Sequence, residues 1–204
     1  MRCFVQTPAE AVFFPAVVLK GGESKMTAAT SPWPDVVAKF KASVWQVWCT
    51  SYKTNFARPY KHATDSLVRG SAFVICADWE KDRVLLATNA HVVADCNKDQ
   101  IVVRAPEITR SEDLVARVVG VAPSKDLALL QVTPESTKLL RSRAAEMHGE
   151  PVDQLVRPIE IVDERVALLD AGELLVIGYP LGMQVVKSSI GIVSGMQTET
   201  DSEH

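Results

Sequence analysis

Apolar residues occur along this chain in short runs that are separated by polar or proline-containing segments. Runs of this length that are rich in valine, isoleucine and tryptophan are typical of β-strands with at least one buried face. Almost no helical pattern separates the first six runs. The pattern therefore predicts an all-β fold whose first six strands close into an antiparallel barrel. The six predicted strands lie at residues 43–50, 70–76, 84–93, 101–105, 113–121 and 126–132.

The segments around these strands carry turn and helix signals. Residues 51–69 are polar and contain Pro59, which predicts a loop. One helical turn is expected at 35–40, with Asp35 as its N-cap. Residues 134–147 begin with a proline and have the composition of a surface helix.

A second sheet is indicated near the C-terminus. Residues 173–178 and 185–194 have strand patterns on either side of a tight turn at 179–182. With only two strands, this sheet resembles a barrel that has only been begun. We expect three regions: a variable N-terminal extension at 1–35, a first β-barrel at 36–162 and the incomplete start of a second β-barrel at 163–204.

Composition and charge exclude some classes of function. The chain has 204 residues, 47% of them hydrophobic, which is enough for a substantial core. Its net charge is −3 and lysine and arginine are not clustered, which argues against a nucleic-acid partner. No apolar run approaches the roughly 18 residues that a membrane span requires.

The four cysteines form no CxxC pair and do not cluster with histidine, so we expect no metal site. An even number permits two disulfides, but the interpretation we favour is free thiols in a reducing compartment. This favours the interior of the cell, an organelle such as a chloroplast or mitochondrion included, although the compartment stays open. Cys49 and Cys76 lie in strand-like runs and are expected to be small core residues.

The strongest candidate for chemistry is His91. The apolar run at 84–93 leads through a short polar turn to this histidine, at the rim of the predicted barrel. A histidine in an apolar setting is often only structural, but one fixed at a rim can serve as a general base near neutral pH. The remaining histidines, His62, His148 and His204, lie in polar segments and are expected to be solvated.

A second candidate is Asp126, which directly precedes the apolar strand at 127–132. An aspartate in this place is often only a turn residue. Its functional interpretation is a carboxylate that accepts the Nδ1–H of a histidine, fixes its tautomer and stabilises the imidazolium form.

Five segments occur in an order that resembles a known family: GSAFVI, LLATNAHVV, SKDLALLQV, VIGYPLG and GIVSG. Together they are similar to the Deg/HtrA (protease Do-like) branch of the trypsin-like serine proteases, and most similar to the eukaryotic Deg proteins. The resemblance covers about residues 43–197. It implies a chymotrypsin-like double β-barrel with the active site between the barrels, His91 as general base and Asp126 as its orienter.

The resemblance also implies the partners and cofactors. The substrates would be unfolded or misfolded proteins and peptides, no metal or cofactor would be needed, and homo-oligomers would be possible. In this family the nucleophile is a serine in a GNSGGP-type motif, and no GxSGG sequence occurs in this chain. The serines near the C-terminus lack the flanking glycines that would build an oxyanion hole, so none is assigned as nucleophile. They are Ser188, Ser189, Ser194 and Ser202.

We therefore expect a fragment that is truncated before the catalytic serine and is inactive by itself. Its second sheet would leave apolar residues uncovered, among them Leu174, Leu175, Ile177 and Ile192. The alternative is a non-catalytic pseudoprotease, a β-barrel that binds peptides or partners through exposed edges. A cysteine protease of the same fold is disfavoured, because all four cysteines precede Asp126.

Overall fold

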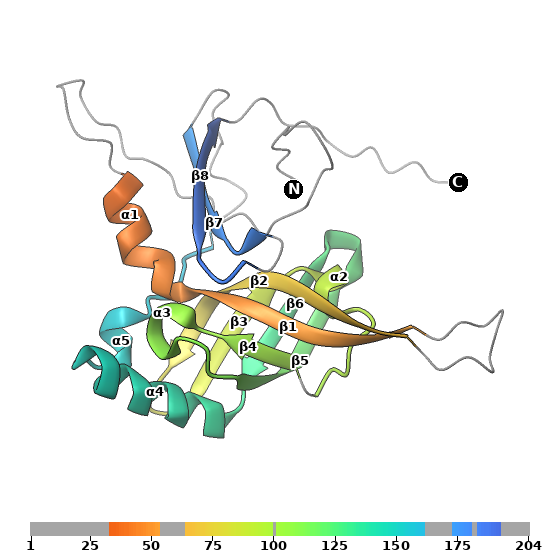
Figure 1. The fold of residues 1–204 in the computed structure, drawn as a ribbon, viewed down its shortest axis with the longest axis horizontal. Coiled ribbons are helices and arrows are strands. Elements are labelled where there is room, and N and C mark those ends of the chain that lie inside the picture. The colour runs from red at the N-terminus through yellow and green to blue at the C-terminus, as the bar shows by residue number, and fades with distance from the viewer. Residues whose placement is uncertain (1–32, 54–63, 100, 162–172, 181–182, 193–204) are drawn as a thin grey trace.

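The computed structural model describes residues 33–53, 64–99, 101–161, 173–180 and 183–192. Within them, six antiparallel strands form a closed barrel in the spatial order β1-β2-β3-β6-β5-β4 (Figure 1). The predicted all-β class with a closed first barrel is confirmed. The strands are β1 (Val44–Lys53), β2 (Thr64–Asp78), β3 (Arg83–Thr88), β4 (Ile101–Arg104), β5 (Leu114–Ala122) and β6 (Leu127–Val132).

The barrel core follows from the alternation of side chains along each strand. In β6, Ala128, Leu130 and Val132 are buried while the residues between them are more exposed. Strands β2 and β5 each carry a register shift, where an extra residue bends the strand and helps the sheet to close. The inward residues of all six strands form one cluster, whose most buried members include Trp45, Val47, Val74, Leu86, Ile101, Val103, Leu114 and Leu130.

Strands β1 and β2 are longer than the sequence predicts. Their pairing runs from Val44 opposite Phe73 to Lys53 opposite Thr64. Residues 51–53 and 64–69 are therefore strand rather than loop, and the prediction was wrong there. The remaining part of the predicted loop, 54–63, lies outside the described residues. Hydrogen bonds between neighbouring strands pair the backbone groups of polar segments as well as those of apolar ones. Strand pairing therefore outweighed the polar composition of residues 51–53 and 64–69.

Helices pack on the outside and at the end of the barrel. Helix α1 (Trp33–Phe40) begins at Trp33, so Asp35 lies in its first turn and is not its N-cap. It is followed by a 3-10 turn, η1 (Lys41–Ser43). Helix α4 (Pro134–His148) confirms the predicted surface helix and ends at Gly149 in the left-handed conformation. Two single-turn helices, α3 (Pro106–Thr109) and α5 (Val152–Leu155), complete this part of the fold.

The C-terminal strands β7 (Glu173–Gly178) and β8 (Lys187–Ile192) pair only with each other among the described strands. One face of β7 is nevertheless covered, because Leu175 and Ile177 pack in a second, smaller core. The expectation that these β7 side chains, and Leu174 with them, would be uncovered was wrong. Figure 1 shows α1 beside this sheet. The buried members of the second core are Trp33, Val44, Ile159, Leu175, Ile177 and Tyr179.

Candidate active site

His91 lies on a single helical turn that follows strand β3. The strand ends at Thr88, and helix α2 (Ala90–Val93) begins two residues later, so the predicted strand over 84–93 stops before the histidine. Val92 and Val93 are buried, whereas the side chain of His91 is 56% exposed. The two valines anchor the turn on the barrel, and this leaves the imidazole on the outer side.

Helix α2 sits unusually close to strand β2. A Cβ atom added to Gly70 would lie 2.8 Å from Cγ2 and 2.9 Å from Cγ1 of Val92. Real side chains do not approach so closely, so the absence of a side chain at Gly70 is what lets α2 pack against the strand. The close packing of Val92 on Gly70 thereby fixes the position of His91, the residue before Val92.

Asp126 lies at the same end of the barrel because of strand pairing. Strands β3 and β6 are neighbours, with Thr88 opposite Ala128. The residues that follow Thr88 and those that precede Ala128 therefore emerge together. A 3-10 turn, η2 (Pro123–Lys125), leads to Asp126, whose φ of 48° and ψ of 45° are left-handed. Aspartate tolerates this region better than most residues, and the conformation directs its side chain towards α2.

The carboxylate of Asp126 binds His91 at two points. One oxygen, Oδ2, lies 2.7 Å from Nδ1 of the imidazole, and the other, Oδ1, accepts the backbone N–H of His91 at 2.9 Å. That N–H is in the first turn of α2, where backbone donors have no partner within the helix. Asp126 therefore fixes the ring and the backbone of the same residue. The two candidates from the sequence are brought together.

Asn89 is a further member of this arrangement that sequence reasoning missed. Its side-chain Nδ2 donates to Oδ2 of Asp126 at 3.1 Å and to the backbone oxygen of Asp126 at 3.3 Å. Asn89 precedes α2 in the N-cap position, where asparagine usually caps its own helix. Here no side-chain cap bond is made, and the amide instead holds the carboxylate. An asparagine before a short helical turn was the available signal.

These contacts set the charge state of Asp126. Partial burial raises the pKa of this carboxyl group, but the hydrogen bonds from the backbone and ring of His91 and from the Asn89 amide outweigh burial and lower it. Asp126 is therefore a carboxylate at neutral pH. A carboxylate held on Nδ1 fixes the tautomer of the imidazole and leaves Nε2 available to exchange a proton with a bound molecule.

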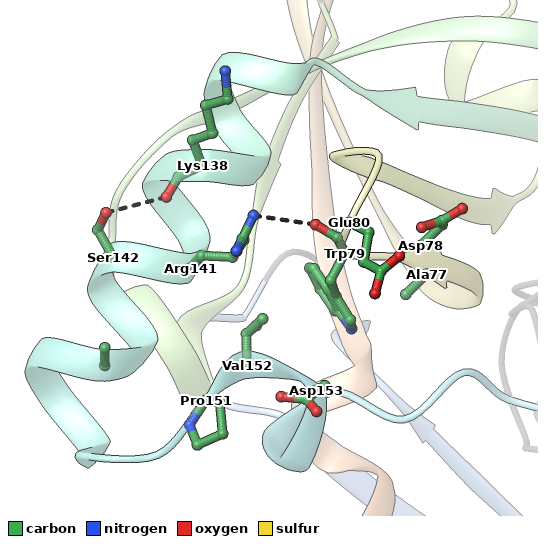
Figure 2. Close-up of a pocket in the computed structure, with 11 residues that line it drawn as sticks. Ala77, Asp78, Trp79, Glu80, Lys138, Arg141, Ser142, Pro151, Val152 and Asp153 are labelled. Carbon is green, nitrogen blue, oxygen red and sulfur yellow. Dashed lines mark hydrogen bonds between the residues drawn. The ribbon is translucent and has the colours of Figure 1, made fainter.

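A separate cavity of the described residues lies elsewhere. It has a volume of about 1020 Å³ and lies between α4, α5 and the turn from β2 to β3 (Figure 2). Its Arg141 donates to the backbone oxygen of Trp79 at 3.1 Å and pairs with Asp82 at 3.0 Å, so the strongest donor in the cavity is already used. In Figure 1, α4 and α2 lie at different ends of the barrel. We therefore base function on the His91 and Asp126 pair.

The remaining sequence candidates are placed as follows. Ser188 and Ser189 lie exposed on β8, whereas Ser194 and Ser202 fall outside the described residues, as do His62 and His204. His148 is exposed at the end of α4, as predicted. In the part of the chain that the structure describes, no three histidine, cysteine or acidic side chains cluster in a way that could hold a metal ion. The described helices are all too short or too polar to cross a bilayer.

Comparison with known proteins identifies the family. A family model described as a trypsin-like peptidase domain matches residues 70–204, about two thirds of the chain, and the match includes both His91 and Asp126. No curated protein matches the chain. The chain therefore belongs to the trypsin-like peptidase domain family, within the trypsin-like serine protease superfamily.

Proposed function

We propose that this member of the trypsin-like peptidase family carries the histidine and aspartate of a Ser-His-Asp triad, with His91 as general base and Asp126 as its orienter. The observation that carries the proposal is the double contact of the Asp126 carboxylate with Nδ1 and with the backbone N–H of His91, at 2.7 and 2.9 Å. A surface ion pair would need only the ring contact. The backbone contact orients the histidine itself, which is what a general base requires.

In the proposed mechanism the histidine moves protons and the aspartate does not. Nε2 of His91 takes the proton of a serine hydroxyl as the oxygen attacks a peptide carbonyl, and later gives it to the leaving amine. Asp126 stabilises the imidazolium that exists between these steps. The sequence contains no GxSGG segment, so we assign none of its serines as the nucleophile.

The finer classification is also a proposal. The five segments GSAFVI, LLATNAHVV, SKDLALLQV, VIGYPLG and GIVSG support assignment to the Deg/HtrA branch, of the eukaryotic Deg type. By this resemblance the substrates are unfolded or misfolded proteins, cleaved without a metal or cofactor, and the protein assembles with copies of itself. The closed barrel supports this assignment only at the level of the fold.

A second candidate function is a non-catalytic barrel that binds peptides. One observation favours it: strand β8 exposes Ile190 and Ile192 at 58% and 61%. An exposed strand with apolar side chains can take up an extended peptide as a further strand. In this alternative His91 and Asp126 would be structural.

One set of variants separates the two functions. The transcript is sequenced beyond the codon for His204, and the protein it encodes is assayed for cleavage of an unfolded protein such as reduced casein. If it is an endopeptidase, His91→Ala lowers kcat by on the order of 10⁶-fold and Asp126→Asn by on the order of 10⁴-fold. His148→Ala, an exposed histidine far from the site, is the matched control and leaves kcat unchanged. Cleavage that survives His91→Ala, or binding of casein without cleavage by the unaltered protein, would favour the second candidate.

A further inference from the structure

Two cysteines from separate elements meet beneath the helix that carries His91. Cys49 lies on β1 and is 4% exposed, and Cys96, three residues after α2, is half-buried. The Sγ of Cys49 donates to the backbone oxygen of Val92 at 2.9 Å, and the Sγ of Cys96 donates to the same oxygen at 3.6 Å. Both thiols are therefore hydrogen-bonded to the carbonyl of Val92, the residue that directly follows His91.

The two thiols also interact with each other. Burial raises the pKa of both groups, and a hydrogen bond between the thiols raises the pKa of Cys49 further while it opposes the rise at Cys96. Two sulfur atoms that share one hydrogen-bond acceptor and are hydrogen-bonded to each other lie close together. A disulfide can form only between sulfur atoms that lie close together. Cys76 differs, because it is exposed on the outer surface of β2, contrary to the expectation of a core residue.

We propose that Cys49 and Cys96 are a redox-active pair that a low-molecular-weight disulfide converts to an intramolecular disulfide. We also propose that this bond changes the environment of the His91 imidazole. Cys96 reacts first because it is the more accessible thiol. Its thiolate attacks one sulfur of the oxidant, forms a mixed disulfide and releases one thiol. The thiolate of Cys49 then attacks the sulfur of Cys96 and displaces the second thiol. Two protein thiols are oxidised, their two protons pass to the two thiolates that leave, and the oxidant is thereby reduced to two thiols.

The link to His91 follows from how α2 is held. The helix is a single turn, so contacts from outside fix its position: the carboxylate of Asp126 at its first turn, and the two thiols on the carbonyl of Val92. Oxidation removes both S–H donors from that carbonyl and ties β1 to the segment after α2. Because Val92 is tightly packed over Gly70, a change at this carbonyl is passed to the neighbouring histidine.

The rate of the reaction is set by the same surroundings. The thiolate is the reactive form, and burial keeps both groups protonated near neutral pH. We therefore expect slow oxidation that reaches equilibrium over hours. Once formed, the bond closes a long loop between residues 49 and 96. It should raise the thermal unfolding midpoint by on the order of 10 °C.

The test uses the full 204-residue chain and glutathione disulfide as the oxidant. After equilibration, peptide mapping without reduction should find the Cys49–Cys96 crosslink in the unaltered chain and in a Cys76→Ser control. Both Cys49→Ser and Cys96→Ser should lose it, and the half-buried Cys96 keeps the test usable if the buried Cys49 variant fails to fold. A Cys96 that stops at the mixed disulfide with glutathione, or a Cys49 that stays free after Cys76 is fully oxidised, would overturn the proposal.

A second readout addresses the coupling to His91. The imidazole NMR signals of His91 should shift on oxidation and return with dithiothreitol, while the signal of His148 stays in place as an internal reference. Unchanged His91 signals in a chain shown to be crosslinked would overturn the coupling. The crosslink and the NMR shift do not depend on protease activity, so they stand even if the proposed triad fails. A redox effect on peptide cleavage rests on the proposed function as well.

Discussion

The closed barrel and the β7–β8 sheet differ in how the edges of their strands are paired. In the barrel every strand has a partner on both sides, so its backbone groups are paired and its side chains surround one core. The sheet has two described strands, and of these only β7 carries buried side chains. On β8 the large side chains of Ile190 and Ile192 are exposed.

This difference explains where the site lies. His91 lies on the segment that follows barrel strand β3, Asp126 lies directly before barrel strand β6, and neither is carried by the sheet. A closed barrel restrains its strand ends on all sides, so it can hold two side chains at 2.7 Å across 35 residues of sequence. In the sheet, the exposed strand β8 is the part suited to pair with another chain.

The largest expected effect comes from truncating one apolar side chain in each region, a buried one in the barrel and an exposed one on β8. Trp45 is fully buried in the barrel, and its indole N–H donates to the backbone oxygen of Ala42 at 2.9 Å. Trp45→Ala should lower the free energy of unfolding by about 3–5 kcal/mol, because it leaves a large cavity. Ile190→Ala on β8 should change it by less than about 0.5 kcal/mol. Urea denaturation measures both, and a similar cost at the two positions would contradict the comparison.

The next effect comes from adding a methyl group to a glycine in each region. In Gly70→Ala the new Cβ would meet the side chain of Val92 at 2.8–2.9 Å. We expect a loss of about 1–3 kcal/mol in stability, together with displacement of α2. In Gly191→Ala on β8 the new Cβ would meet nothing within 4 Å, so no steric cost arises. Thermal unfolding of the two variants tests this, and equal melting points would show that α2 can move at no cost.

A smaller effect is expected where the barrel and the sheet are joined. The Oγ of Ser71 on β2 accepts the backbone N–H of Tyr179 at 2.8 Å, in a buried setting. Ser71→Ala leaves this donor without its acceptor, so we expect a loss of about 1–3 kcal/mol, towards the lower end because the cavity is small. Ser189→Ala on exposed β8 is the control and should be neutral. Hydrogen exchange at the amide of Tyr179 should accelerate only in the Ser71 variant, and unchanged protection would argue that another group holds this junction.

The smallest effect is the pH dependence that Asp126 gives to the barrel. The pKa of Asp126 lies below its usual value of 3.8 in the folded chain. The unfolded chain therefore binds this proton more readily, so the stabilisation is fully present above about pH 5 and is lost as pH falls through the folded-state pKa. The difference in unfolding free energy between the unaltered chain and Asp126→Asn should shrink on acidification. Asn89→Ala should show a weaker trend, and a difference that is constant between pH 7 and pH 3 would contradict the assigned contacts.

Local patterns were sufficient for much of the fold and for the two main site residues. The short apolar runs located all six barrel strands, and the proline and glycine signals at 134 and 149 bounded helix α4. His91 and Asp126 could be found because each follows or precedes a strongly apolar strand. Such features depend on residues that are close in sequence, so one sequence is enough to identify them.

Only the tertiary structure decided how distant segments meet. Pairing with a neighbour made strands of residues 51–53 and 64–69, and the register of β3 with β6 brought His91 to Asp126. The same register placed the Asn89 amide on the carboxylate, and barrel closure turned Cys49 inward to Cys96 while Cys76 faced outward. Strand pattern fixes which residues share a face, but barrel closure and bulges set which faces and ends come together. That is why the residue types pointed to the chemistry, whereas their contacts came from long-range packing.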